Sequence, residues 1–301
     1  MKPALRTLII AFLAGPLAIS PAAVSADGDL IGRPATHLVA QGDSFVAIAR
    51  TYDVGYLELI AANPGIDPWL PEMGTPLTIP TRHVLPDAPR RGIVINLSEP
   101  RLYLFRAAGL PVLTFPAAVG KRGCETPVGE TRVVGKRRDP VWVPPESVRQ
   151  ERPWLPPSVA PGPDNPLGRF AIDLGWPEIV VHGTNQPAGV GRRVSHGCVR
   201  LYPEDMARLF SLVELGLPVT VVDQPVKLGW DGGMLYLEIH PTRQELDILE
   251  LGGDFERTPI PELVRAIKQR AGDAAHRVDW GAVRDAEIAR TGIPRPVLRF
   301  D

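Results

Sequence analysis

The sequence predicts a mainly β central domain with one packed helix, preceded by a small α+β domain and followed by an α+β subdomain. Apolar residues alternate with a period of two through much of residues 91–223, which is typical of strands. They recur at helical spacing in residues 36–85 and again in residues 224–301. The 34 prolines indicate many rigid loops and argue against a helical bundle.

Length and charge narrow the class of protein. The 301 residues suggest two domains or three small ones, because domains usually have about 100–200 residues. The 33 Lys and Arg nearly balance the 34 Asp and Glu, for a formal net charge of -1. Domains that bind nucleic acid are usually strongly basic, so we expect no nucleic-acid partner.

Residues 1–26 have the pattern of a secretory signal peptide. Two basic residues precede the apolar run Leu8–Leu13, and small residues up to Ala26 close it. We expect cleavage near Ala26, which gives an exported chain without a stable membrane span. An uncleaved anchor is the alternative, although the run is much shorter than the ~20 residues of a spanning helix.

Residues 27–35 read as a linker to the small domain at 36–85. In that domain we expect a strand at 38–40, an N-cap at Ser44 that begins a helix, a second helix at 54–63 and a strand at 76–80.

The central domain at 91–223 begins with an expected hairpin at 92–105. The other expected elements are strands at 112–119, 131–134, 168–174, 178–182 and 218–222, and a helix at 203–215. The Pro-rich segment 139–166 is long for a structureless connection, and such loops are usually functional.

Residues 224–301 contain no motif that indicates chemistry. We expect a hairpin around 235–239 and helices at 261–272 and 279–291, forming a subdomain that packs on the central domain.

The candidate chemistry lies between two of the expected strands. His182 ends an apolar strand, and Cys198 follows 16 residues later, after a segment rich in Gly and Arg. An imidazole can activate a thiol as a nucleophile. Gly197 allows the backbone to turn so that N–H groups face a developing oxyanion, and Arg200 can bind a carboxylate. These residue types in this order indicate acyl transfer.

Two other interpretations stay open at this point. His182, His196 and Cys198 are acceptable zinc ligands, but no fourth ligand has a suitable spacing. Cys198 can also be an inert buried thiol. The remaining cysteine, Cys124, either pairs with Cys198 or stays a free thiol, because two cysteines make no disulfide framework.

The segment 182–206, "HGTNQPAGVGRRVSHGCVRLYPEDM", resembles the signature of the L,D-transpeptidase family (YkuD type), in which a His precedes Ser/Thr-His-Gly-Cys. Segments 93–105, 126–133 and 139–148 are also similar to that family. In residues 36–85, "QGDSFVAIARTYDV" and "GTPLTIP" resemble a LysM domain, which binds glycans that contain N-acetylglucosamine. The chain is therefore similar to the subgroup with an N-terminal LysM module.

The resemblance implies a β-sandwich-like catalytic domain that needs no cofactor and no metal. Cys198 is then the nucleophile, and it attacks the bond between the diamino acid and the terminal D-Ala of a peptidoglycan tetrapeptide stem. His182 is the general base, and the Gly183 carbonyl orients its ring. The resemblance places the other candidate residues in two groups: oxyanion or orienting residues Gly197, Ser195 and His196, and substrate-binding residues Arg200, Asn185 and Trp142.

The same resemblance implies a periplasmic enzyme with peptidoglycan stem peptides and glycan as partners. The acceptor is either a second stem, which gives a 3-3 cross-link, or an outer-membrane lipoprotein. An L,D-carboxypeptidase or thiol amidase of the same fold is the alternative, and a non-catalytic peptidoglycan-binding protein is another. Cys124 departs from the family pattern, and we expect it to lie away from the site.

Overall fold

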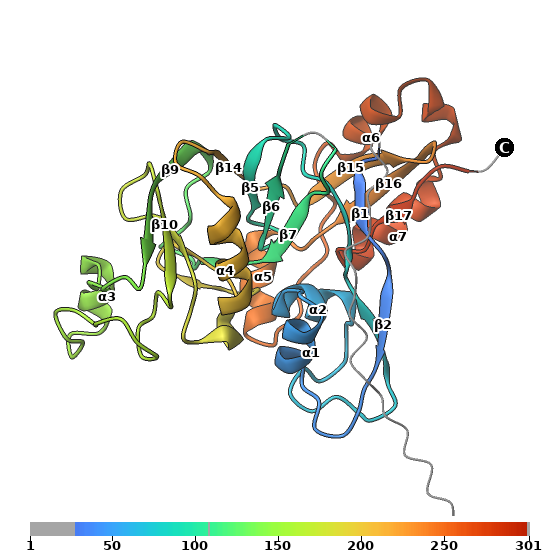
Figure 1. Cartoon of the computed structure of the whole chain (residues 1–301). Coiled ribbons are helices and arrows are strands. Elements are labelled where there is room, and N and C mark those ends of the chain that lie inside the picture. Colours follow the sequence, from blue (N-terminus) through green and yellow to red (C-terminus); the bar gives the residue numbers. More distant parts are fainter. Residues whose placement is uncertain (1–27, 108, 300–301) are drawn as a thin grey trace, which may run out of the picture.

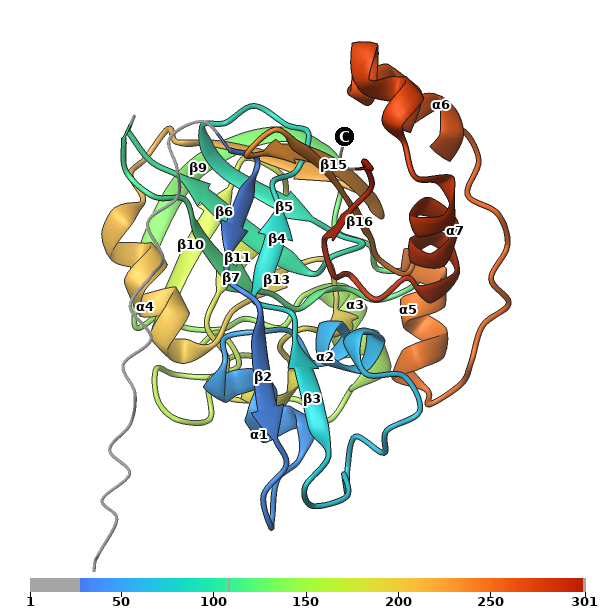
Figure 2. The same cartoon turned by 90° about the vertical axis from the view of Figure 1, so that its right-hand side faces the viewer.

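The computed structural model describes residues 28–107 and 109–299, so the predicted signal peptide lies outside the described residues. The centre of the molecule is one eight-stranded sheet in the order β13-β11-β10-β9-β14-β5-β6-β7. Figure 1 labels β9, β10, β14, β5, β6 and β7 of this sheet, and Figure 2 also labels β11 and β13. Two neighbouring pairs are parallel, β11 with β13 and β14 with β5. The strands are β5 (Gly92–Asn96), β6 (Arg101–Phe105), β7 (Leu113–Pro116), β9 (Gly129–Arg138), β10 (Phe170–Leu174), β11 (Val180–His182), β13 (Val199–Arg200) and β14 (Pro218–Val222).

Helix α4 (Pro203–Leu212) packs on this sheet. Its Met206 and Leu209 are fully buried in the core of the sheet, and the ring of Phe210 lies 4.7 Å from the ring of Phe170 on β10. The predicted helix extended to residue 215, but the chain becomes extended at Val213, which is buried in the same core. The predicted mainly β domain with one packed helix is confirmed.

Two stretches of this domain differ from the expectation. The expected strand at 112–119 is divided into two strands with different partners. Strand β7 pairs with β6, whereas the following strand β8 (Val119–Gly120) pairs with β12 (Arg193–Ser195). The segment 139–166, expected as a loop, contains the short helix α3 (Glu146–Glu151). The short turn η1 (Pro187–Gly189) lies between His182 and β12.

The N-terminal unit contains β2 (Ala35–Leu38), α1 (Phe45–Thr51), α2 (Tyr56–Ala62) and β3 (Pro76–Ile79). The Ser44 hydroxyl accepts the Ala47 N–H at 3.4 Å and caps α1 as expected. The first strand lies three residues earlier than predicted. The linker prediction for residues 27–35 is wrong in part, because β1 (Leu30–Gly32) pairs with β4 (Arg82–Val84).

The C-terminal subdomain combines the sheet β15-β16-β17 with three α-helices. Figure 2 shows these helices along one side of the molecule. No helix in residues 28–107 and 109–299 has the length and apolar character needed to cross a bilayer. The elements are β15 (Val226–Asp231), β16 (Met234–Ile239), α5 (Arg243–Glu250), α6 (Leu263–Ala271), the 3-10 helix η2 (Gly272–Arg277), α7 (Trp280–Ala289) and β17 (Arg295–Pro296).

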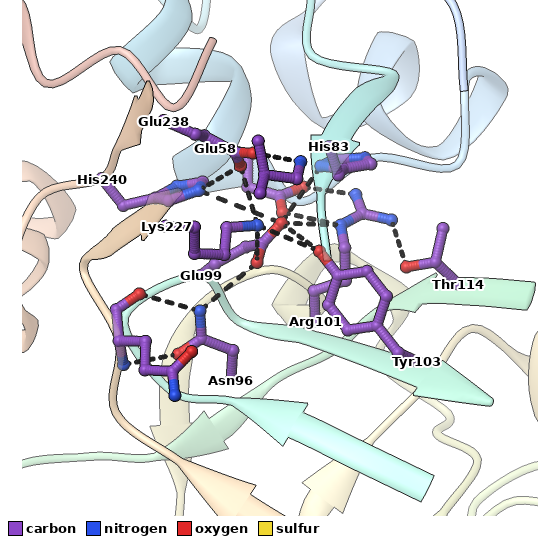
Figure 3. A network of polar contacts seen from close by, with 12 residues as sticks. Glu58, His83, Asn96, Glu99, Arg101, Tyr103, Thr114, Lys227, Glu238 and His240 are labelled. Atoms are coloured by element: carbon purple, nitrogen blue, oxygen red, sulfur yellow. Dashed lines mark hydrogen bonds and ion pairs between the residues drawn. The ribbon is translucent and has the colours of Figure 1, made fainter. Parts of the chain in front are cut away.

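A buried network of charged groups joins the three parts of the chain (Figure 3). From the N-terminal unit, Glu58 accepts two hydrogen bonds from Arg101 on β6, at 2.9 and 2.6 Å. From the C-terminal subdomain, Lys227 lies 2.6 Å from Glu99 and 2.8 Å from Glu238. A buried ion is stable only when it is paired, so Glu58 depends on Arg101, and Glu99 depends on Lys227, in a neighbouring part of the chain.

The pKa of Glu99 shows how strong this compensation is. Burial alone would raise the pKa of this carboxyl, but Lys227, His240 and His83 together hold it well below its usual range. The network therefore keeps Glu99 ionised and fixes the N-terminal unit and the C-terminal subdomain against the central sheet.

Candidate active site

His182 is the last residue of β11, near the edge of the central sheet. The preceding Val181 is fully buried in the core, so the alternation along a strand directs His182 to the opposite face. The His182 carbonyl accepts the Leu201 N–H at 2.9 Å, which fixes its backbone to the segment after Cys198. The side chain is almost completely buried.

One hydrogen bond determines which nitrogen of His182 is free. Nδ1 lies 2.6 Å from the Gly183 carbonyl oxygen. Because a carbonyl can only accept, Nδ1 donates the proton and the neutral ring keeps a lone pair on Nε2. Burial, with the positive charges of Arg200 and Arg137, lowers the pKa of His182 to about 3. The ring is therefore neutral at neutral pH and can accept a proton at Nε2.

Cys198 lies immediately before β13, which runs parallel to β11. The register pairs Val181 with Val199 and His182 with Arg200. Since Val181 and Val199 face the core, alternation places Cys198, Arg200 and His182 on the same face. The Cys198 thiol contacts the Glu178 carbonyl at 3.3 Å. Burial raises the pKa of this thiol, so the resting pair consists of a neutral thiol and a neutral imidazole.

The backbone before Cys198 is turned by Gly197, whose φ is +95°. The Gly197 carbonyl accepts the Thr126 hydroxyl at 2.9 Å. In a trans peptide the N–H points opposite to the C=O, so the Cys198 N–H points away from Thr126. Within residues 28–107 and 109–299, the N–H groups of Gly197 and Cys198 have no hydrogen-bond acceptor. Both N–H groups are therefore free to donate to a bound molecule.

Arg200 lies on the same face as His182 and has no acidic partner among the described residues. Its Nε is buried and makes no hydrogen bond. Burial lowers the pKa of Arg200 despite the nearby Cys198 sulfur. Arg200 is half-buried and has no counter-ion in the described part of the chain, and a bound carboxylate would compensate its charge.

The other residues of the motif hold the site together. The Ser195 hydroxyl donates to the Cys198 carbonyl and is completely buried. His196 Nε2 lies 3.2 Å from Glu151, and its Nδ1 lies 3.3 Å from the Ser147 hydroxyl, so α3 covers this ring. The contacts of Ser147 and Glu151 with His196 could not be predicted from the sequence, because a six-residue helix in a Pro-rich segment has no clear periodic signal.

Trp142 belongs to the segment 139–166, and Asn185 forms a hydrogen bond to it. The Asn185 side chain donates to the Asp164 carbonyl at 3.0 Å, and the Trp142 backbone pairs with Val159. Both residues thereby help to order this segment, although no hydrogen bond joins either side chain to the Cys198 thiol in the described part of the chain.

Cys124 lies nearer to the motif than expected from the sequence. Its sulfur is 3.7 Å from His196 Nδ1, and both Cys124 and Cys198 are free thiols. Among the described residues, two groups of side chains are close enough to hold a metal ion, and neither contains His182 or Cys198. One is Cys124 with Glu151 and His196, and the other is His83 with Glu99 and Glu238.

The segment between His182 and Cys198 is held by the two flanking parts of the chain. The Gly191 carbonyl accepts the Leu57 N–H of α2 at 3.1 Å. A Cβ on Gly191 would lie 2.2 Å from the Tyr56 nitrogen, so only glycine fits this contact. Arg193 donates to Asp247 of α5 at 2.7 Å. These contacts fix the course of the backbone that returns from His182 to Cys198.

A thiol and a neutral imidazole on one face, with free N–H groups and an arginine that lacks an acidic partner, are suited to acyl transfer, and a class of enzymes uses such groups for this reaction. The comparisons with known families agree with that class. The family YkuD, the L,D-transpeptidase catalytic domain, matches residues 90–221, and the LysM domain matches residues 37–80.

Two similar proteins align with nearly the whole chain. "Probable L,D-transpeptidase YcfS" of Escherichia coli (strain K12) is 38% identical over 90% of this chain and 85% of that protein. "Probable L,D-transpeptidase ErfK/SrfK" of Salmonella typhimurium is 39% identical over 88% of this chain and 86% of that protein. The crystal structure of Mycobacterium tuberculosis L,D-transpeptidase 1 is 27% identical, with a TM-score of 0.31 over 48% of this chain and 66% of that one. The chain belongs to the L,D-transpeptidase family.

Proposed function

We propose that this L,D-transpeptidase transfers acyl groups between peptidoglycan stem peptides, with Cys198 as the nucleophile and His182 as the general base. The observation that carries the proposal is the register of β11 and β13, which gives the thiol and the imidazole a common face. The free lone pair on Nε2 and the uncompensated Arg200 on that face support it.

In the first step, Nε2 of His182 takes the thiol proton and the sulfur attacks the carbonyl of the bond between the diamino acid and D-Ala. The N–H groups of Gly197 and Cys198 stabilise the oxyanion. His182 then gives the proton to the leaving nitrogen, D-Ala departs and a thioester remains on Cys198. Because both groups are neutral at rest, the proton moves during the attack and no thiolate accumulates beforehand.

In the second step, an amine attacks the thioester. His182 accepts the amine proton, the C–S bond breaks and the proton returns to the Cys198 sulfur. Arg200 is suited to hold a carboxylate of the stem peptide, because no acidic side chain of the described residues pairs with it. The amine comes from the diamino acid of a second stem, which forms a 3-3 cross-link, or from an outer-membrane lipoprotein.

The domain boundaries and location belong to the same proposal. Residues 91–223 form the catalytic domain, residues 36–85 the LysM domain and residues 224–301 the C-terminal subdomain. An enzyme that acts on the cell wall works outside the cytoplasm, and the pattern of residues 1–26 indicates export to the periplasm.

The test uses residues 27–301 and the Cys198→Ala variant with tetrapeptide muropeptides, followed by mass spectrometry of the products. Dimers that are lighter than two monomers by one alanine, formed only with Cys198, would support 3-3 transpeptidation. If D-Ala is lost without formation of dimers, a peptide with the C-terminal lysine of a lipoprotein is added next. Attachment of this peptide to the stem would indicate a lipoprotein acceptor, and its absence would indicate a carboxypeptidase. Absence of any Cys198-dependent product would contradict the proposal and leave a glycan-binding protein.

A further inference from the structure

A cavity of about 520 Å³ lies between the N-terminal unit and the C-terminal subdomain. One wall consists of α2 and the loop that follows it, from Tyr56 to Trp69. The other wall is formed by the end of α5 and the loop after it, from Leu249 to Arg257. The volume is within the ~300–1,000 Å³ of small-molecule sites. No residue of the catalytic face lines this cavity.

The first wall offers one exposed aromatic ring, that of Trp69. Trp69 is 64% exposed, although tryptophan side chains are on average largely buried. Its ring lies 6.1 Å from that of Tyr56, and the Arg192 guanidinium lies 3.6 Å from the centre of the Tyr56 ring. An exposed ring at the mouth of a cavity can pack against the apolar face of a sugar ring.

The second wall supplies polar groups without an uncompensated charge. Asp254 pairs with Arg257 at 2.9 Å, and Glu250 pairs with Arg192. The second carboxylate oxygen of Glu250 is buried and has no hydrogen-bond partner. A pocket whose charges are paired internally favours a neutral ligand with many hydroxyl and amide groups over a phosphate, a cation or an acidic peptide.

We propose that this cavity is a composite glycan site, in which residues 249–257 of the C-terminal subdomain complete a binding surface begun by the loop of the LysM domain. Its ligand is the N-acetylhexosamine backbone of peptidoglycan, so the inference rests on the proposed function. It assigns a role to part of the C-terminal subdomain, which has no chemistry of its own. Arg192 contacts Tyr56 and Glu250, which both line the cavity. Because Arg192 belongs to the segment between His182 and Cys198, it connects the wall of the cavity with the backbone of the candidate active site.

The experiment measures the binding of an N-acetylglucosamine tetramer to residues 27–301 by titration calorimetry. Trp69→Ala tests the first wall and Asp254→Ala tests the second, and both residues are exposed, so the fold is retained. Trp280→Ala and Asp285→Ala are the matched controls, because these residues lie on α7 and do not line the cavity. We expect each test variant to bind about 2- to 10-fold more weakly, which corresponds to one lost contact, and the controls to be unchanged.

Two results would overturn the composite site. If only Trp69→Ala weakens binding, the LysM domain binds alone; if the tetramer does not bind at all, the cavity is no glycan site. Release of D-Ala from a soluble disaccharide tetrapeptide is measured in the same variants. Retention of this Cys198-dependent activity together with absent glycan binding would refute the inference while leaving the proposed function intact.

Discussion

Replacement of Lys227 by methionine tests the network that joins the three parts of the chain. Lys227 is completely buried and is the common partner of Glu99 and Glu238, at 2.6 and 2.8 Å. Methionine fills much of the same volume but leaves both carboxylates without this cation. Removing one partner of a buried pair usually costs about 3–5 kcal/mol. At roughly 2–4 °C per kcal/mol for a chain of this size, the melting temperature should fall by about 6–20 °C.

The assay is urea unfolding followed by both circular dichroism and tryptophan fluorescence, since coincident transitions justify a single free energy. Lys268→Met is the matched control, because Lys268 is exposed and forms no ion pair among the described residues. In the double variant Lys227→Met/Glu238→Gln, part of the loss should be recovered, because one uncompensated charge is removed with its partner. A loss below about 1 kcal/mol for Lys227→Met would refute the reasoning that the network holds the parts together.

The sign of the pH dependence follows from Glu99. Its pKa is lower in the folded protein, so its contribution to stability is present above the unfolded pKa of about 4.3 and is lost as the pH falls through the folded value. Without Lys227 the folded pKa should rise. Lys227→Met should therefore unfold at a higher pH than the wild type in an acid titration.

Three further predictions concern the catalytic face, and a fourth concerns Cys124. Because burial raises the pKa of Cys198, its alkylation by iodoacetamide should be slower at pH 7 than that of a free cysteine and should still rise above pH 9; a plateau below pH 7 would instead indicate a preformed thiolate. Because the pKa of His182 is about 3, kcat/KM for D-Ala release should show no acidic limb near pH 6.5. Arg200→Gln should raise KM by about 10-fold or more with intact Cys198 alkylation, whereas an unchanged KM would exclude carboxylate binding by Arg200. Cys124→Ser should keep activity within about twofold under reducing conditions, and a large loss would place Cys124 in the site.

Long periodic segments could be predicted from the sequence, and short elements could not. The hairpin at 92–105, the strand β14 and the helix α4 depend on runs of apolar residues with a regular period. The strands β1 and β13 have three and two residues, so their pairing depends on neighbours that are distant in the sequence. Helix α5 was not predicted, although Thr242 and Glu245 have the spacing of the capping box that they form.

The candidate site also combines features that the sequence predicts with features that it does not. The types and order of His182, Gly197 and Cys198 predict acyl transfer, and this assignment stays a prediction. The missing partner of Arg200 and the proximity of Cys124 to His196 could not be predicted, because both depend on which side chains the folded sheet brings together. The contact of Arg193 with α5 is of the same kind, since 54 residues separate the two partners.

The most direct test of the central claim is the intact mass of the protein during turnover. Residues 27–301 are mixed with a tetrapeptide muropeptide whose diamino acid side-chain amine is acetylated, so that it can serve as donor but not as acceptor. The protein is then quenched in acid and weighed beside the Cys198→Ala variant. The mechanism predicts that the wild type gains the mass of the muropeptide less one alanine, that peptide mapping places this mass on Cys198, and that the variant gains nothing. The same mass gain in Cys198→Ala, or its location on another residue, would contradict the assignment of Cys198 as the nucleophile.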